Sequence, residues 1–415
     1  MNANSNRTGP LYGLKVLDLS RVLAGPWATQ ILGDLGAEII KIEQPGVGDD
    51  TRRWGPPFLG DGSGDAAYYL AANRNKRSLA IDLSHPKGAD LVRRLAGQCD
   101  IVVENFRVGG LVKYKLDHTT LCAEHPSLIY CSITGFGQDG PYSNRGGYDF
   151  LVQGMSGLMS VTGRPDGEDG AGPMKVGIPV SDLFTGLYAV IAILGALKHR
   201  DMTGEGQHID CALLDTQVAL LTNQASNSLN GGVTPIRRGN DHPNVVPYRD
   251  FMTSDGSVLV ALGNDGQFRR FCALLGKPEI ASDVRFTDNA SRAAHREELT
   301  SQLAEAIGTW KSVELLSEME KAGLPGGPVN TIGEVLADPH IQARNLVQTL
   351  QRADGTDVKF LGFPARLSKT PADYQLAPPL MGEHTFAVLT DLLGLDPLKL
   401  ENLRSAGVIG GGDRE

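Results

Sequence analysis

The chain has little of what marks several large classes of protein. Among 415 residues there are only five cysteines, an odd number with no CxxC pair, which argues against a disulfide framework and a zinc knuckle. The nine histidines include no HxxxH or HxH spacing, so we predict no metal site. The longest apolar run, Leu183–Leu197, is interrupted by Thr185 and Gly186 and is too short to span a bilayer. We therefore expect no membrane partner.

A basic excess is also missing. Lys and Arg total 39 and Asp and Glu total 48, which gives a net charge of −9. Because phosphate contacts need a basic surface, this balance argues against a general nucleic-acid partner, although a local basic pocket for a small anion stays open. Residues 1–13 have no apolar core and a single Arg, so they predict neither a signal nor a transit peptide, and the expected location is cytoplasmic.

Two nucleotide-binding fingerprints are absent. The segment after the first predicted strand is SRVLAGPWATQ rather than GxGxxG, and no GxxxxGK[ST] occurs anywhere in the chain. An ordinary NAD enzyme and a P-loop nucleotidase are therefore both unsupported.

Short apolar runs alternate with amphipathic segments over the first 135 residues. This alternation implies parallel βαβ units and a doubly wound, Rossmann-like α/β sheet, whose ligands lie beyond the carboxyl ends of the strands. The predicted strands are 14–20, 38–43, 78–84, 100–106 and 127–137, and the predicted helices are 24–35 and 86–98. The segments expected to reach a ligand are 21–26, 44–54, 105–110 and 134–141.

The pattern changes after residue 223. Helices are predicted at 183–199 and 213–229, followed by a Gly/Pro/Asn-rich stretch, a hairpin around Asp255-Gly256 and helices at 265–275, 295–308 and 312–322. We therefore expect a large domain from residues 1–223, an inserted smaller α+β domain from 224–329 and a return to the large domain from 330–415. The tail after Gly407 is predicted to be disordered.

Asp182 lies between a Gly/Pro turn and the long apolar helix. One interpretation is an N-cap or first-turn acid stabilised by the helix dipole. The other is a nucleophile, because a carboxylate at a helix N-terminus is expected to stay ionised at neutral pH. The two interpretations are compatible.

A series of motifs in the chain resembles family III CoA-transferases, the group that contains formyl-CoA:oxalate and carnitine CoA-transferases. The series covers about 370 residues in family order: GLKVLDLSRVLAGPWATQILGDLGAEIIKIEQPGVGDDTR, NRNKRSLAIDL, VVENFRVGGL, SITGFGQDGP, VSDLFTG, KHRDMTGEGQHIDCALLD, GLPGGPVN and PLMGEHT. GDDTRRWGPPF, NRNKRS, IYCSITGFGQDGP and GLYAVIAILGALKHR most resemble the succinyl-CoA:glutarate branch. The resemblance implies an intertwined, ring-like homodimer.

The resemblance also implies a reaction. Asp182 attacks an acyl-CoA, with succinyl-CoA expected as donor, and aspartyl anhydride and aspartyl-CoA thioester intermediates carry CoA to a short dicarboxylic acid such as glutarate. Coenzyme A and its acyl thioesters are then substrates, and no permanently bound cofactor is expected. Such steps divide a difficult transfer into near-balanced exchanges, and water must be kept out.

Site residues follow from the resemblance position by position. The implied CoA contacts are Val22, Leu23, Ala24, Gln44, Ile81, Asp82, Leu83, Ser84, Asn105, Phe106, Arg107, Lys113, Thr134, Gly135, Phe136 and Gly137. The implied substrate contacts are Trp54, Tyr68 and Tyr148, with Arg52, Arg237 and Arg238 as hypothetical anchors for a distal carboxylate, since Arg binds carboxylates bidentately. The alternative for the loop arginines is a solvated surface charge.

Several positions depart from the formyl-CoA type. Lys113 replaces an Arg and keeps only a point charge, while Gln44 and Thr134 replace cations, so Arg107, Lys76 or Arg77 are expected to compensate. A run of four glycines is replaced by PIRRGNDHPNVVPY, which argues against oxalate as acceptor.

Two alternatives stay open at this point. A 2-methylacyl-CoA racemase of the same fold carries a His in a GHD setting, where this chain has Tyr148, and Tyr is a poor base at neutral pH. A non-catalytic CoA-binding protein is the other alternative.

Overall fold

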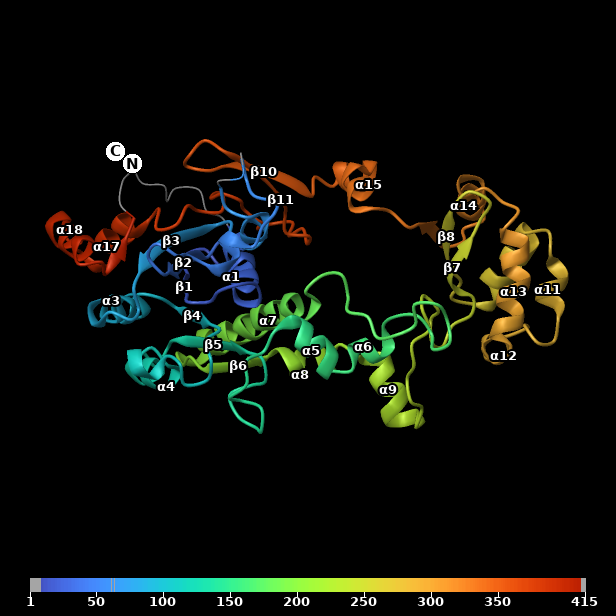
Figure 1. The fold of residues 1–415 in the computed structure, drawn as a ribbon, viewed down its shortest axis with the longest axis horizontal. Coiled ribbons are helices and arrows are strands. Elements are labelled where there is room, and N and C mark those ends of the chain that lie inside the picture. The colour runs from blue at the N-terminus through green and yellow to red at the C-terminus, as the bar shows by residue number, and fades with distance from the viewer. Residues whose placement is uncertain (1–8, 61, 63, 412–415) are drawn as a thin grey trace. The chain divides into compact units, whose positions relative to one another are not determined.

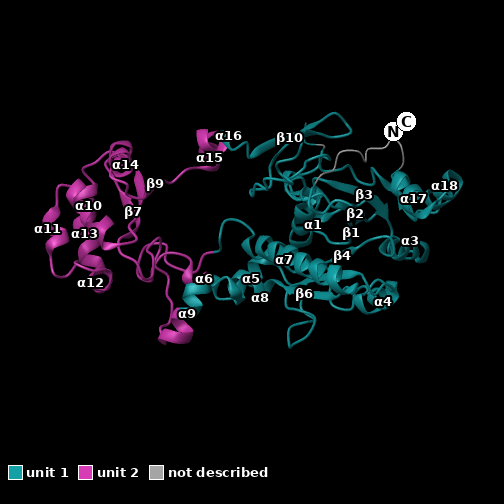
Figure 2. Ribbon diagram, turned by 180° about the vertical axis from the view of Figure 1, so that it is seen from behind, with its two compact units in different colours: residues 1–158, 175–226, 342–415 teal, residues 159–174, 227–341 magenta. Residues whose placement is uncertain are grey.

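The computed structural model describes residues 9–60, 62 and 64–411, which form two compact units (Figure 2). The first unit comprises 1–158, 175–226 and 342–415, and the second comprises 159–174 and 227–341. The second unit is thus longer than the predicted small domain of 224–329. It includes 159–174 because this segment is bonded to the later loop: the Gly239 N–H donates to the Gly163 carbonyl at 3.1 Å.

The first unit is built on a seven-stranded sheet of order β12-β3-β2-β1-β4-β5-β6 (Figure 1). Strands β1 to β6 are parallel, and their order is that of a doubly wound dinucleotide-type sheet, as predicted. Their bounds are β1 Lys15–Asp18, β2 Glu38–Glu43, β3 Lys76–Ile81, β4 Ile101–Glu104, β5 Ile129–Thr134 and β6 His208–Ala212.

The predicted disordered tail is wrong in part. The β12 strand, Ile409–Gly410, pairs antiparallel with β3, so the chain returns to the sheet edge after Gly407. A pair of glycines near a terminus hid this strand, because Gly is normally depleted in strands. Residues 412–415 lie outside the described part.

Alternation along each buried strand produces a core on both faces of the sheet. In β1, Val16 packs on the face covered by helices α1 (Ala24–Asp34) and α7 (Val180–Thr203), whereas Leu17 packs on the opposite face. The helices that cover that opposite face are α3 Pro86–Ala96, α4 His118–Glu124, α17 Thr385–Leu393 and α18 Pro397–Ser405. The sheet is therefore buried on both sides.

Helix α7 is longer than predicted. With 24 residues it is the one described helix long and apolar enough to cross a membrane by length and composition, although 44% of its most apolar window is buried. The statement that this segment is too short to span is therefore wrong on length. Core helices of soluble proteins pass the same test, so this finding is weak evidence for a membrane-spanning helix.

The predicted helix at 213–229 is two helices. It divides into α8 Leu213–Ala219 and α9 Thr222–Gly231, because Thr222 has a φ of +36° and interrupts the helical backbone. The first unit is completed by α2 Ala67–Leu70, α5 Asp149–Met155, the hairpin β10 Val347–Gln351 and β11 Asp357–Leu361, and two 3₁₀ turns, Asp50–Arg53 and Val112–Tyr114. Helix α6, Leu158–Val161, crosses the boundary between the units.

The second unit is α+β, as predicted. The expected hairpin is β7 Tyr248–Met252 with β8 Ser257–Ala261, and β9 Gly326–Pro328 adds a third strand where only a chain break was expected. Its helices are α10 Asp265–Leu274, α11 Pro278–Ser282, α12 Asn289–Ala294, α13 Arg296–Ile307, α14 Ser312–Lys321, α15 Ile332–Ala337 and α16 Pro339–Ala343.

Candidate active site

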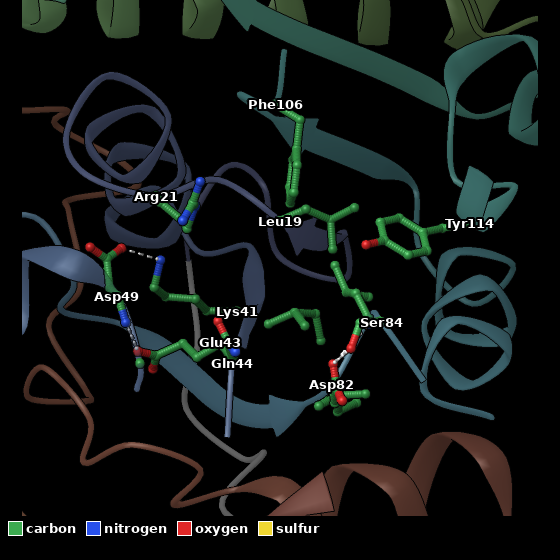
Figure 3. Close-up of a pocket in the computed structure, with 14 residues that line it drawn as sticks. Leu19, Arg21, Lys41, Glu43, Gln44, Asp49, Asp82, Ser84, Phe106 and Tyr114 are labelled. Carbon is green, nitrogen blue, oxygen red and sulfur yellow. Dashed lines mark hydrogen bonds and ion pairs between the residues drawn. The ribbon is translucent and has the colours of Figure 1, made fainter. Parts of the chain in front are cut away.

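Two pockets in the first unit contain most of the predicted site residues. The smaller, of about 200 Å³, opens beyond the carboxyl ends of β1, β2 and β3 (Figure 3). Its lining includes the predicted residues Gln44, Ile81, Asp82, Leu83, Ser84 and Phe106. Asp82 accepts from the Ser84 N–H at 2.8 Å and from its hydroxyl at 2.6 Å, which closes the turn after β3. Its walls combine apolar side chains and the rings of Phe106 and Tyr114 with the charged side chains of Lys41, Glu43 and Asp49.

The larger pocket, of about 470 Å³, contains Asp182. It shares Arg21, Phe106 and Tyr114 with the smaller pocket, so one extended ligand can occupy both. The predicted residues that line it with Asp182 are Val22, Leu23, Ala24, Asn105, Phe106, Arg107, Lys113, Thr134, Gly135 and Tyr148.

Asp182 is in the first turn of α7, and a second carboxylate caps the same helix. Asp149 accepts from the Ser181 N–H at 2.7 Å and from the Asp182 N–H at 3.4 Å, and Gln153 holds its other oxygen at 2.6 Å. Burial, and then the charge of Asp149, raise the pKa of Asp182 to about 7. This raised pKa runs against the expectation that the helix N-terminus keeps Asp182 ionised at neutral pH.

An aromatic pair lies close to this carboxyl. Trp54 and Tyr68 meet edge to face with ring centroids 5.4 Å apart. Burial, followed by the charges of Asp182 and Asp149, raises the pKa of Tyr68 to about 12. Tyr68 is therefore a neutral phenol at neutral pH, close enough for the charge of Asp182 to raise its pKa.

Two predicted CoA contacts line neither pocket. Phe136 is buried beneath Tyr142, with ring centroids 5.7 Å apart, and the Gly137 N–H donates to the Thr134 hydroxyl at 2.9 Å. Phe136 and Gly137 therefore support the conformation of the loop after β5 and do not line either pocket.

Arg52 is not available to a substrate. It is 7% exposed, and its guanidinium binds both oxygens of Glu43 at 2.7 and 2.8 Å and Asp65 at 2.9 Å, while stacking on the ring of Tyr69. Its role as a carboxylate anchor is a wrong prediction, because neighbouring acids already occupy all three of its nitrogens. The basic residue instead fixes the segment after β2.

The two cations proposed to compensate at the phosphates are also occupied. Lys76 is completely buried, donates to Asp18 at 3.1 Å and to the Pro26 carbonyl at 2.9 Å, and burial lowers its pKa to about 8. Arg77 pairs with Glu38 at 2.7 Å and lies 3.5 Å from Asp391. Compensation must come from elsewhere.

Sequence reasoning missed two cations that line the Asp182 pocket. Arg21 follows β1, and Arg145 lies over the rings of Phe136 and Tyr142 in the loop after β5. Together with Arg107 and Lys113, they give this pocket four cationic side chains, of which Arg21 is paired with Asp50 at 3.2 Å. Arg21 lies in the segment 21–26 that was expected to reach a ligand, whereas Arg145 lies beyond the segment 134–141 and had no such signal.

The second unit holds Arg237 and Arg238. Arg237 donates to the Arg164 carbonyl at 3.2 Å and forms an ion pair with Asp166, which makes it a loop brace. Arg238 lies with Arg249 and Arg296 around Asp241, which is 3.4 Å from Arg249 and 3.9 Å from Arg296.

This arginine cluster is short of negative charge. Burial, and repulsion from Arg238 and Arg249, lower the pKa of Arg296 in spite of Asp241. Asp241 is paired with Arg249 and Arg296, and Arg238 adds a third positive charge near Arg296. Among the described residues, no group of His, Cys, Asp and Glu side chains is arranged to hold a metal ion.

Comparison with known proteins identifies relatives that are named as CoA-transferases. A family model described as CoA-transferase family III matches residues 11–385. A succinate–glutarate CoA-transferase of Agrobacterium fabrum is 51% identical over 93% of this chain and 96% of its own length. A human succinyl-CoA:glutarate CoA-transferase is 42% identical over 98% of this chain and 91% of its own.

Solved structures share the fold. A CAIB/BAIF family protein from Brucella suis is 49% identical, covers 93% of this chain and all of its own, and superposes with a TM-score of 0.82. Rv3272 from Mycobacterium tuberculosis is 31% identical, with coverage of 92% and 99% and a TM-score of 0.81.

Proposed function

The chain belongs to CoA-transferase family III, and from this membership we propose that it transfers CoA from succinyl-CoA to a short dicarboxylic acid such as glutarate. The observation that carries the proposal is the placement of Asp182 in a pocket continuous with the predicted CoA contacts. The names of the two succinate–glutarate relatives support the choice of donor and acceptor.

We propose a covalent route through Asp182. Its carboxylate attacks the thioester carbon, the C–S bond breaks, and CoA leaves as the thiolate with a mixed anhydride on the enzyme. The thiolate then attacks the Asp182 carbonyl carbon, which releases succinate and leaves an aspartyl-CoA thioester. The acceptor carboxylate displaces CoA from that thioester, and the thiolate attacks the acceptor carbonyl, which forms the new acyl-CoA and regenerates Asp182.

The protonation state of Asp182 fits a transient nucleophile. Its carboxyl is ready to react only when ionised, and the raised pKa places that ionisation near pH 7. A less stabilised carboxylate is also a stronger nucleophile, because its charge is poorly solvated before attack. Tyr68 is neutral at this pH, and it lies near enough to Asp182 for the charge of that carboxylate to raise the pKa of its phenol.

The CoA moiety is assigned to the two joined pockets. The adenine fits between Phe106 and the turn Asp82–Ser84, and the phosphates face Arg21, Arg107 and Lys113. Arg145 adds a further cation to the same pocket. These cations take the place of the missing ones at Gln44 and Thr134.

We also propose a homodimer. One face of α7 carries a stripe of apolar side chains at helical spacing that are between 37% and 62% exposed. The stripe consists of Phe184, Leu187, Tyr188, Ile191 and Leu194. Light scattering of the full chain should give the mass of two copies, and a monomer at micromolar concentration would contradict the proposal.

The experiment that tests the function is an assay of glutaryl-CoA formation from succinyl-CoA and glutarate. The wild type should catalyse the transfer and Asp182→Ala should not. Uptake of solvent deuterium by a 2-methylacyl-CoA, without transfer, would indicate a racemase instead. Binding of CoA without either reaction would indicate a CoA-binding protein.

A further inference from the structure

Val22 has a backbone conformation that its side chain disfavours. It lines the pocket of Asp182, and its φ is +68°, in the left-handed region. A β-branched residue is an outlier there, at a cost of order 1–3 kcal/mol. Such a conformation persists only where the surrounding structure imposes it.

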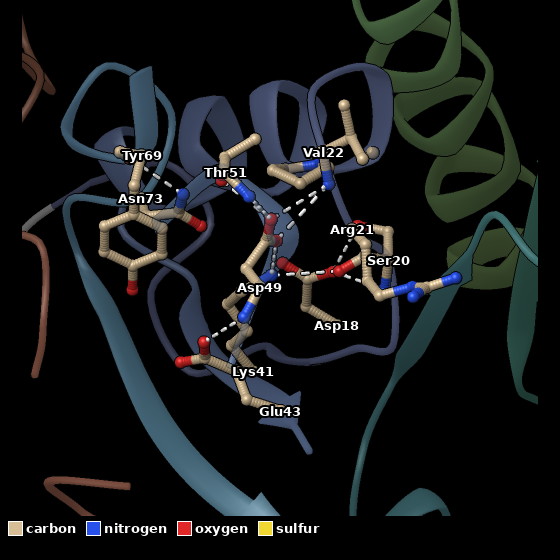
Figure 4. Close-up of polar contacts among 12 residues, drawn as sticks. Asp18, Ser20, Arg21, Val22, Lys41, Glu43, Asp49, Thr51, Tyr69 and Asn73 are labelled. Atoms are coloured by element: carbon tan, nitrogen blue, oxygen red, sulfur yellow. Dashed lines mark hydrogen bonds and ion pairs between the residues drawn. The ribbon is translucent and has the colours of Figure 1, made fainter. Parts of the chain in front are cut away.

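We call residues 20–22 the Ser20–Val22 turn (Figure 4). The structure imposes the conformation of Val22 by hydrogen-bonding every backbone polar group of this turn from the Ser20 N–H to the Val22 N–H. The Ser20 N–H donates to Asp18 at 2.9 Å. Asn105 accepts from the Arg21 N–H at 2.9 Å and donates to the Arg21 carbonyl at 2.7 Å. Two further contacts complete the set, and both come from one ion pair.

That ion pair is Lys41 with Asp49, 3.0 Å apart and completely buried. Lys41 also donates to the Ser20 carbonyl at 2.9 Å, and both Asp49 oxygens lie 3.3 Å from the Val22 N–H. Thr51 orients Asp49 through its N–H at 3.0 Å and its hydroxyl at 2.7 Å. The pair therefore holds the turn from both sides of Arg21.

Stability alone does not account for a pair of this kind. Removing two charges from water costs several kcal/mol each, and apolar replacements of buried pairs are often neutral or stabilising. Burial opposes the charge on each group, yet Asp49 raises the pKa of Lys41 and Lys41 lowers that of Asp49, so both stay charged. A charged pair aimed at the ends of a strained turn has a positioning role.

We propose that Asp49, together with Lys41, is a positioning residue of the transfer reaction: it holds Val22 in the left-handed conformation and so fixes residues 22–24 against the pocket of Asp182. The inference rests on the proposed function and adds to it. Both side chains are completely buried, and both also border the smaller pocket, so a change of the pair also alters one wall of that pocket. We call the ion pair of Lys41 and Asp49 the clamp. Without the clamp, Val22 leaves the left-handed conformation and the wall of the pocket formed by residues 22–24 shifts.

The test is rescue by glycine. In Lys41→Met/Asp49→Asn, which removes the pair without leaving one charge alone, kcat should fall about ten- to hundredfold as Val22 leaves its strained conformation. Because Lys41 and Asp49 also border the smaller pocket, the KM for succinyl-CoA is expected to change as well, and the rescue of kcat by glycine is the readout that separates the two effects. Adding Val22→Gly should restore most of kcat, since glycine adopts a positive φ without strain.

Val22→Ala in the same background is the matched control, because it also shortens the side chain but keeps a Cβ and should restore less. If the double variant does not fold, Thr51→Val replaces it: it removes the hydroxyl hydrogen bond to Asp49 but keeps the backbone N–H bond to the same oxygen, so we expect a smaller loss and the same rescue. An unchanged kcat, or equal rescue by alanine and glycine, overturns the positioning role. No transfer by the wild type overturns the proposed function itself, and the inference with it.

Discussion

Ionised Asp182 should destabilise the folded chain, and replacing it should make the protein more stable. Its pKa is about 7 in the folded chain against an ordinary 3.8, because of burial and the charge of Asp149. Each pKa unit corresponds to about 1.36 kcal/mol, so the ionised group lowers the free energy of unfolding by about 4 kcal/mol. Asp182→Asn removes the ionisation and keeps the shape.

The effect depends on pH in a fixed direction. Between the two pKa values the folded chain holds a proton that the unfolded chain has lost, so the stability of the wild type falls as pH rises from about 4 to about 7. The variant lacks this loss. It should exceed the wild type in free energy of unfolding by about 2 kcal/mol at pH 5 and about 4 kcal/mol at pH 8.

Urea unfolding at pH 5 and pH 8 measures the difference. The chain has three tryptophans, and in a Trp310→Phe background the fluorescence comes only from Trp27 and Trp54, both in the first unit. Asp139→Asn is the control, because Asp139 is exposed and its replacement should change stability by less than about 0.5 kcal/mol. A variant that is equally or less stable at pH 8 would refute the reasoning.

Two further substitutions should have different effects: Asp149→Asn should change the pH dependence of activity, and Arg52→Met should lower the stability of the fold. Burial is the main cause of the raised pKa of Asp182, and Asp149→Asn removes the second cause, a negative charge, so the rise of kcat/KM with pH should move to lower pH. The Asn oxygen can still accept from the Ser181 N–H, so the loss of stability should stay below about 1 kcal/mol. An unmoved pH profile would show that Asp149 does not act on Asp182. Arg52→Met leaves Glu43 buried without its partner, so it should cost about 3–5 kcal/mol of stability, seen as a lower Tm. A normal Tm with a raised KM for the acid would restore Arg52 as an anchor.

The sheet could be predicted from the sequence because its signal is local. Buried parallel strands appear as short apolar runs, and Glu38–Glu43 was predicted with its observed bounds. The two-residue strand β12 escaped, since pairing with β3 across the whole chain is a tertiary event with no local pattern. The same holds for Met159–Met174, which joins the second unit through contacts with a loop far along the chain.

The site could be predicted only as far as strand ends and motif positions define it. Three segments expected to reach a ligand, 21–26, 105–110 and 134–141, line the pocket of Asp182, because they follow β1, β4 and β5 at one sheet edge. The individual contacts were implied only by the resemblance to family III CoA-transferases. Which charged side chains are free and which are already paired could not be predicted, because pairing depends on burial and on partners distant in sequence. Arg52 looked free in DDTRRWG, but Glu43 and Asp65 occupy it, and the clamp of Lys41 and Asp49 is equally invisible in the sequence.

The most direct test of the central claim is an intact-mass spectrum of the full chain mixed with succinyl-CoA, with Asp182→Ala beside it. The account predicts that the wild type gains the mass of a CoA or acyl adduct, that hydroxylamine removes it, and that Asp182→Ala gains nothing. An adduct of equal yield on Asp182→Ala, or transfer activity in that variant, would contradict catalysis through this carboxylate.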